Sequence, residues 1–327
     1  MTEAGKDIIY VLLWGDLPST VRGLASCRRI REAHPRAKLI LLTAPDYESM
    51  LKHCPYFSQV ETDATATGAM AKLTAKRIKA MKPAVVYDLV DDGDSRRIKG
   101  GLRFSRIKWL DAAPRMEAAT HPVEATAVAL GRAGLGPDHF RLGEAPAPDV
   151  SWVDYLARTS RMLEPEYFGL NGPYALLAPA GEDVKANLRW PRERWASLAQ
   201  ALMQHGVTPA IVGGPSARDV GRFVASAVEG ARDVTGKAKL VQLAGLARRT
   251  RFVFGEETDL LHLLVAAGPP AAALFPVDEG RNPALRVPRG ASPVITLHAP
   301  VLAQLTAEEA LQAMRVAGGF EESPRAA

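Results

Sequence analysis

The sequence predicts an α/β protein made of two Rossmann-like domains that face a central cleft. Short apolar strands alternate with amphipathic helices along the chain, and this alternation implies parallel sheets. The alternation begins twice, at Ile8–Leu13 and again at Tyr174–Ala178. The chain of 327 residues is also longer than one hydrophobic core usually supports. We therefore expect these two strands to be central strands of separate sheets.

The charge balance favours small anionic ligands. The chain has 41 Lys and Arg against 36 Asp and Glu, which gives a formal charge of +5. This mild excess suits an anionic substrate without requiring a nucleic acid, and we expect no nucleic-acid partner.

The cysteines and the N-terminal apolar run fit a protein of the reducing cytoplasm. Cys27 and Cys54 form neither a CxxC pair nor a cluster with histidines. No zinc site or disulfide framework is predicted, and we expect neither a metal nor a cofactor. The apolar run Ile8–Trp14 is too short to span a membrane, and no small-residue cleavage site follows it.

The first half is expected to continue in strand and helix units. Gly15-Asp16 leave the first strand, and Asp16 either reaches the cleft or caps the next helix. The further elements expected are helix Thr20–Ala33, strand Lys38–Leu42, strand Gln59–Glu61, helix Ala69–Met81 and strand Ala84–Leu89.

A cationic segment, residues 96–108, follows the acidic loop Asp91–Asp94. It contains no acidic residue, and its cations are Arg96, Arg97, Lys99, Arg103, Arg106 and Lys108. The segment is either a solvated helix face or a binding site for a phosphorylated or acidic acceptor at a membrane surface.

The second half repeats this architecture after a region rich in Gly, Pro and Ala. We place the first domain at residues 1–165, the second at 166–300 and a C-terminal segment at 301–327. The elements expected are helix Trp152–Leu163, strand Tyr174–Ala178, helix Arg192–His205, strand Pro209–Val212, a helix ending at Val228 and a last helix at Ala307–Val316.

The stretch 251–275 changes its apolar period halfway and predicts a β-loop-α-β unit. Phe252–Phe254 and Ala271–Phe275 are the expected strands, and Thr258 is the expected N-cap of the helix between them. The N-terminus of that helix offers unpaired N–H groups and partial positive charge to an anion such as a diphosphate. The alternative is a unit that serves packing alone.

Four motifs in order carry a family resemblance. Gly15-Asp16 follow the first strand, Arg189-Trp190-Pro191 and Trp195 follow the strand that ends before Pro179, and Gly213-Gly214-Pro215 follow the next strand. The fourth motif runs from Glu257 to Pro270 and includes His262. Together they resemble glycosyltransferase family 9, the ADP-heptose:lipopolysaccharide heptosyltransferases.

The resemblance implies the GT-B fold, with the last helix packed back on the N-terminal domain. It also implies an inverting, metal-independent transfer of a heptose or related sugar from a nucleotide sugar such as ADP-heptose. The implied acceptor is the lipopolysaccharide core or another cell-surface glycan, bound as an anionic glycan or glycolipid by the first domain. We expect peripheral contact with the inner face of the cytoplasmic membrane.

Such a transfer needs a carboxylate that accepts the acceptor's proton, and cations or dipoles that stabilise the departing diphosphate. Asp16 is the expected base. His262, a lone histidine between leucines, either reaches a phosphate or ribose or packs in the core. The expected donor-binding residues are Lys185, Arg189, Gly213, Gly214, Glu257, Thr258 and His262, and the expected acceptor-binding residues are Arg96, Arg97, Lys99, Arg103 and Arg106.

The chain departs from the family pattern in the donor motifs. Leu188 stands where the family often has a lysine, and Asp259 where a glycine lets backbone N–H groups approach the diphosphate. Glu257 replaces an aspartate. These departures leave open an active transferase with an altered donor preference, a degenerate GT-B protein that binds a sugar nucleotide or glycan without transferring it, and an epimerase-like enzyme.

Overall fold

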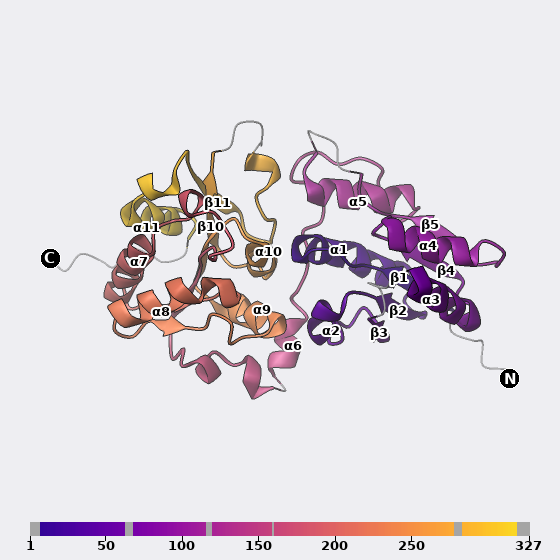
Figure 1. Cartoon of the computed structure of the whole chain (residues 1–327), viewed down its shortest axis with the longest axis horizontal. Coiled ribbons are helices and arrows are strands. Elements are labelled where there is room, and N and C mark those ends of the chain that lie inside the picture. The colour runs from indigo at the N-terminus through magenta and orange to yellow at the C-terminus, as the bar shows by residue number, and fades with distance from the viewer. Residues whose placement is uncertain (1–6, 63–67, 116–119, 159, 278–282, 319–327) are drawn as a thin grey trace. The chain divides into compact units, whose positions relative to one another are not determined.

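The chain divides into two compact units, Met1–Asp149 (unit 1) and Val150–Ala327 (unit 2) (Figure 1). The structure is a computed structural model that describes residues 7–62, 68–115, 120–158, 160–277 and 283–318. The division precedes the expected boundary at residue 165 because α6 (Val153–Ala157) packs against α9 (Leu240–Arg249) of unit 2. Arg248 of α9 forms an ion pair with Asp154 of α6, with Nη2 and Oδ2 2.7 Å apart.

Unit 1 contains a parallel five-stranded sheet with strand order β3-β2-β1-β4-β5. The strand β1 is central, as expected. The sequence pattern did not reveal β5, which begins at the last cation of the cationic segment. The strands are β1 (Ile8–Leu12), β2 (Lys38–Leu42), β3 (Gln59–Glu61), β4 (Val85–Asp88) and β5 (Lys108–Asp111).

Helices cover both faces of this sheet. Tyr10 and Leu12 of β1 share one core cluster with α3 and α4. On the other face, α1 approaches so closely that a Cβ at Gly23 would lie 2.5 Å from Leu13 Cδ1. The helices are α1 (Leu17–Ala33), α2 (Pro45–Leu51), α3 (Gly68–Met81), α4 (Gly93–Leu102) and α5 (Pro122–Arg132), of which α2 and α5 were not expected.

Unit 2 contains a separate parallel sheet of six strands with order β11-β10-β9-β6-β7-β8. The expectation that the strand at Tyr174–Ala178 is central to a second sheet is confirmed. The sequence pattern missed β8 and β11. The strands are β6 (Tyr174–Ala178), β7 (Thr208–Ile211), β8 (Arg232–Asp233), β9 (Phe252–Glu256), β10 (Ala271–Pro276) and β11 (Val294–Ala299).

The core of unit 2 is built around aromatic side chains. Trp190 and Trp195 both pack against Phe254 of β9, with ring centroids 5.6 Å apart in each case. The expected helix Trp152–Leu163 is α6 followed by a short 3-10 turn, and residue 159 lies outside the described residues. The remaining helices are α7 (Arg192–Gln204), α8 (Arg218–Ala227), α10 (Asp259–Ala266) and α11 (Ala307–Val316), and the 3-10 turns are Arg161–Leu163, Pro165–Phe168, Ala186–Leu188, Pro215–Ala217, Pro283–Leu285 and Leu302–Gln304.

The last helix, α11, packs in the core of unit 2. Its bounds are those expected, and its buried side chains Ala310, Ala313 and Met314 lie in the core cluster of unit 2. They contact α7 and the strands β9, β10 and β11. Unit 2 therefore covers this apolar face of α11, and the expected contact of the helix with the first domain stays a prediction.

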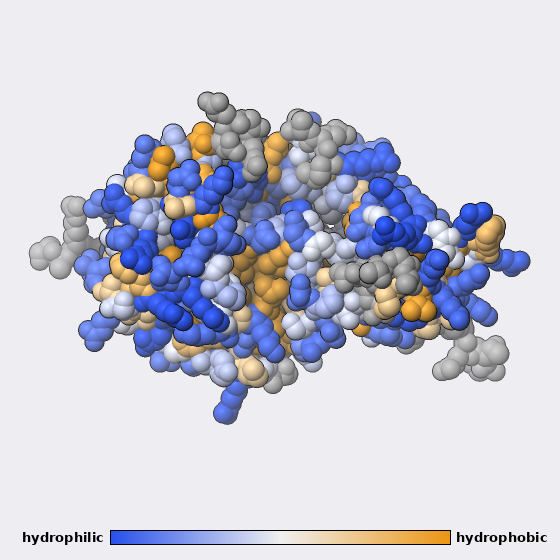
Figure 2. All heavy atoms as spheres, in the orientation of Figure 1, coloured by the Kyte–Doolittle hydropathy of each residue, from blue (hydrophilic) through white to orange (hydrophobic). Residues whose placement is uncertain are grey.

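The described part of the chain contains no helix that is long and apolar enough to cross a membrane. Hydrophilic side chains cover most of the face seen in Figure 2.

Replacing Met314 by Ala tests the packing of α11. Met314 is fully buried, so Met314→Ala leaves a cavity and should lower the free energy of unfolding by about 2 to 5 kcal/mol. Val316 is 65% exposed on the same helix, and Val316→Ala should change stability by about 0.5 kcal/mol or less. Urea denaturation of both variants measures this, and equal effects would contradict the packing.

Candidate active site

The loop after β1 places Asp16 at the start of α1. Gly15 has a φ of 124°, a backbone conformation that favours glycine, and the Tyr47 hydroxyl donates to the Gly15 carbonyl oxygen at 3.0 Å. The Oδ1 atom of Asp16 accepts a hydrogen bond from the Ser19 N–H at 2.7 Å. Asp16 thus caps α1 and lies exposed at the carboxyl edge of the sheet. Its role as a base stays a prediction.

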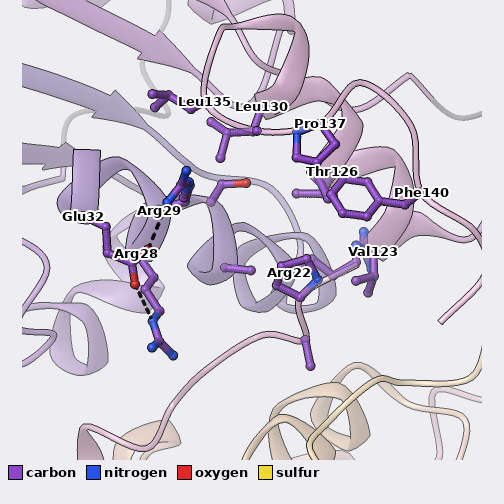
Figure 3. Close-up of a pocket in the computed structure, with 16 residues that line it drawn as sticks. Arg22, Arg28, Arg29, Glu32, Val123, Thr126, Leu130, Leu135, Pro137 and Phe140 are labelled. Carbon is purple, nitrogen blue, oxygen red and sulfur yellow. Dashed lines mark hydrogen bonds and ion pairs between the residues drawn. The ribbon is translucent and has the colours of Figure 1, made fainter. Parts of the chain in front are cut away.

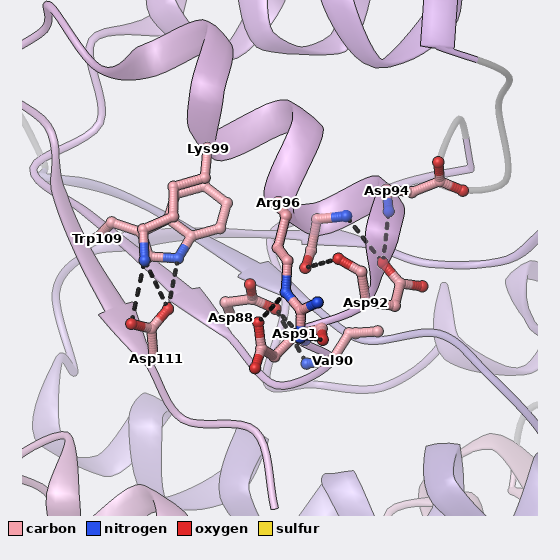
Figure 4. A network of polar contacts seen from close by, with 10 residues as sticks. Asp88, Val90, Asp91, Asp92, Asp94, Arg96, Lys99, Trp109 and Asp111 are labelled. Atoms are coloured by element: carbon pink, nitrogen blue, oxygen red, sulfur yellow. Dashed lines mark hydrogen bonds and ion pairs between the residues drawn. The ribbon is translucent and has the colours of Figure 1, made fainter.

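Hydrogen bonds to Asp88 and Asp92 fix the loop that follows the neighbouring strand β4 (Figure 4). Asp88 is 1% exposed and accepts hydrogen bonds from the N–H groups of Val90 and Asp91, each at 3.0 Å. Burial raises the pKa of the Asp88 carboxyl. Trp14 Nε1 donates to Asp92 Oδ2 at 2.7 Å and so ties the exit of β1 to that of β4. Sequence analysis missed Asp88, although an acid at the end of a buried strand was a visible signal.

The cationic segment does not present a single helix face. The helix α4 ends at Leu102, so Arg103, Arg106 and Lys108 follow it. The guanidinium of Arg103 lies over the ring of Phe104, 4.5 Å from its centroid.

Acids that flank the cationic segment neutralise part of its charge (Figure 4). Three ion pairs join Arg96 to Asp91 at 2.9 Å, Arg97 to Asp94 at 2.5 Å and Lys99 to Asp111 at 3.0 Å. The acidic loop before the segment was evident in the sequence, but its pairing with these cations and the contribution of Asp111 were not expected. Acceptor binding by these cations stays a prediction.

A cavity of about 460 Å³ in unit 1 lies between α1 and α5 (Figure 3). Apolar side chains such as Val123, Leu130 and Phe140 line it, together with arginines of α1. Arg28 and Arg29 are both paired with Glu32. None of the predicted site residues lines this cavity.

The loop from β6 to α7 carries the predicted donor cations of unit 2. Lys185 is exposed, whereas Arg189 is half-buried and its Nε atom is buried with no hydrogen-bond partner among the residues that the structure describes. After β7, a Cβ at Gly213 would lie 2.7 Å from the Cβ of Ala217, whereas Gly214 borders open space. Gly213 therefore serves close packing, and Gly214 leaves room at the strand end.

Glu256, which sequence analysis missed, fixes both ends of this loop. Its Oε2 accepts from the Ala180 N–H and its Oε1 from the Trp190 N–H, each at 2.6 Å. The side chain is 2% exposed, and this burial raises the pKa of Glu256 to about 7. The two N–H donors and the nearby Arg189 oppose the rise. Glu256 was not predicted from the sequence, because the family motif was assigned to the adjacent Glu257.

The N-terminus of α10 lies directly after these acids. Thr258 is the N-cap residue, as expected, but its side chain makes no capping hydrogen bond. Asp259 is exposed in the first turn, and His262 is half-buried one turn later. Glu257 forms a two-pronged ion pair with Arg286, in which Nε donates to Oε1 and Nη2 to Oε2. The structure therefore gathers Arg189, Glu257, Thr258 and His262 around the carboxyl edge of β9.

Possible metal ligands are not clustered in the described ranges. Among these residues, no three His, Cys, Asp or Glu side chains are grouped to hold a metal ion.

Two separate parallel α/β units are the components of the GT-B fold, and solved structures with this fold match nearly the whole chain. A family 9 glycosyl transferase from Veillonella parvula is 17% identical with a TM-score of 0.74, covering 97% of this chain and 98% of that one. The E. coli ADP-heptose lps heptosyltransferase II is 16% identical with a TM-score of 0.71 over 94% and 98%. E. coli heptosyltransferase WaaC with ADP is 17% identical with a TM-score of 0.70 over 95% and 99%.

The family itself follows from the sequence match. The family model of Glycosyltransferase family 9 (heptosyltransferase) matches residues 101–308, and the chain belongs to this family. No curated protein matches the chain.

Glu256 should make stability depend on pH. Its pKa is about 7 in the folded chain against an ordinary value of 4.5, so the folded state binds more protons between these pH values. The resulting stabilisation is complete below about pH 4.5 and is lost as pH rises through about 7, by roughly 3 kcal/mol. Glu256→Gln removes this titration. Urea denaturation from pH 5 to 8 should show wild type losing stability relative to the variant, and parallel profiles would contradict the assignment.

Proposed function

We propose that the chain transfers a heptose or related sugar from an ADP-heptose-like donor to the lipopolysaccharide core or another cell-surface glycan. The observation that carries this proposal is an exposed carboxylate, Asp16, at the carboxyl edge of unit 1 in a family 9 glycosyltransferase. The WaaC enzyme has been solved with ADP and with ADP-2-deoxy-2-fluoro heptose, which supports an ADP-sugar donor.

The proposed reaction is a single displacement with inversion and without a metal. The Asp16 carboxylate accepts the proton of the acceptor hydroxyl while that oxygen attacks the anomeric carbon. The bond from this carbon to the diphosphate oxygen breaks on the opposite face. The partial positive charge at the N-terminus of α10 and the cations near it stabilise the departing diphosphate.

The acceptor is proposed to bind unit 1 through acidic or phosphate groups. Arg96, Arg97 and Lys99 have acid partners on exposed surface, where ion pairs are weak and exchange readily with a ligand. An anionic glycolipid fits this exchange. Peripheral contact with the inner face of the cytoplasmic membrane is part of the proposal.

A second candidate is binding of a sugar nucleotide without transfer. The ion pair between Glu257 and Arg286 favours it, because both oxygens of Glu257 already hold the guanidinium. A transfer assay separates the two candidates.

Asp16→Asn is the direct test of transfer. Asn caps a helix as well as Asp does, so α1 should stay intact while the proton acceptor is lost. Turnover should fall on the order of 10²- to 10⁴-fold with ADP affinity preserved. Asp138 is an exposed acid elsewhere in the same unit, and Asp138→Asn should keep most of the activity. Full activity of Asp16→Asn would remove the proposed base.

Asp259→Gly tests the position of the donor diphosphate. The side chain is exposed, so its repulsion of an anion at the N-terminus of α10 is screened by water. Removing it should tighten ADP binding by about 1 kcal/mol, close to fivefold, as titration calorimetry would show. Glu308, in the first turn of α11, provides the control Glu308→Gln, which should leave ADP affinity unchanged. Weaker binding of every nucleotide by Asp259→Gly would place the diphosphate elsewhere.

A further inference from the structure

A cation that the family motifs do not include reaches the N-terminus of α10. Arg286 follows β10 in the chain and binds Glu257, the residue just before the N-cap Thr258. Their side chains are only 21% and 25% exposed. The ion pair is therefore a mostly buried part of unit 2 at the carboxyl end of β9.

Only part of the Arg286 guanidinium is used by this ion pair. The Nη1 atom of Arg286 is buried and has no hydrogen-bond partner among the described residues. The Nε atom of Arg189 is in the same state. Buried N–H donors in native proteins nearly always have partners, so an acceptor that binds at the end of β9 would satisfy the Nη1 atom of Arg286.

The departures from the family pattern change the charges that a bound diphosphate would meet. Leu188 removes a cation from the donor motif, and Asp259 adds a carboxylate in the first turn of α10. A diphosphate at this helix N-terminus would meet Glu257 and Asp259 as like charges. Arg286 neutralises Glu257 and brings a further N–H donor, Nη1, to this helix N-terminus.

We propose that Arg286 binds the diphosphate of the donor and that Glu257 positions Arg286 instead of holding the sugar hydroxyls. The planar guanidinium suits this role, because one edge is held by the carboxylate while other N–H groups face the phosphate oxygens. This inference rests on the proposed function, since it places a nucleotide diphosphate in unit 2.

Arg286→Met tests the phosphate contact in the full chain. ADP affinity should fall about 10- to 100-fold, the range for a hydrogen bond to a charged group, while adenosine affinity changes less than about twofold. The wild type should also lose ADP affinity with salt more steeply than the variant. Arg251, an exposed arginine at the amino end of β9, provides the control Arg251→Met, which should bind ADP as the wild type does.

A double-mutant cycle tests the positioning role of Glu257. If Glu257 acts through Arg286, Glu257→Gln weakens ADP binding in the wild type. It does not weaken ADP binding in the Arg286→Met background, where the carboxylate has lost its partner and only repels the diphosphate. The ratio of ADP-heptose to ADP affinity should stay constant throughout. A fall in that ratio for Glu257→Gln in both backgrounds would return Glu257 to the sugar hydroxyls and overturn its positioning role.

The outcomes separate this inference from the proposed function. Unchanged ADP affinity in Arg286→Met, or an equal loss for adenosine and ADP, overturns the phosphate contact while the proposed transfer stands. If wild type binds none of ADP, UDP, GDP and dTDP in calorimetry, the proposed function and this inference both fail.

Discussion

The carboxylate of Glu256 is the contact on which the candidate donor site of unit 2 depends. One oxygen binds the N–H of Ala180 just after β6, and the other binds the N–H of Trp190 at the far end of the loop that carries Lys185 and Arg189. A loop whose two ends bind one carboxylate is fixed relative to β9. Because the N-cap of α10 follows two residues after Glu256, one buried acid sets the places of the loop cations and of the helix N-terminus together.

The same region explains why the last helix belongs to unit 2. Trp190 packs edge-on against Trp195, with centroids 4.9 Å apart, and its Nε1 atom donates to the Leu305 carbonyl oxygen at 2.9 Å. Thr306 then caps α11 through the N–H of Glu309. Trp190, whose N–H binds Glu256, thus also holds the chain just before α11. The stability of α11 and the position of the loop from β6 to α7 therefore depend on the same core.

Local patterns in the sequence predicted most helices and strands, but they could not predict contacts between residues far apart in the chain. The bounds of α11 were predicted to the residue, because a helix cap and a 3.6-residue period are local signals. Its packing partner was not, because an amphipathic pattern shows that a face is buried but not what covers it. The strand β8 has two residues and β11 is mostly half-buried, so neither forms a continuous apolar run.

In the candidate site too, local roles could be predicted from the sequence and long-range contacts could not. The cap role of Asp16 was weighed from the sequence, since an acid after a strand and before a helix is a local pattern. The partner of Glu257 lies 29 residues away, and only the fold around β9 and β10 brings Arg286 to it. Glu256 and Glu257 are adjacent residues of the same type, and successive side chains of a strand point in opposite directions. Glu256 therefore has a buried structural role, whereas Glu257 lies beside the N-terminus of α10.

Burial makes the charged groups of the two units behave differently. Lys99 and Asp111 pair with side chains 45% and 57% exposed, so water screens the pair and an anionic ligand displaces the carboxylate at little cost. Arg286 and Glu257 are mostly buried, and separating them would leave a charge in a poorly solvated place. The cations of unit 1 can therefore exchange partners readily, as the proposed binding of an acidic acceptor requires. The guanidinium of Arg286 in unit 2 is held by Glu257 before any ligand arrives, as the proposed contact with a diphosphate requires.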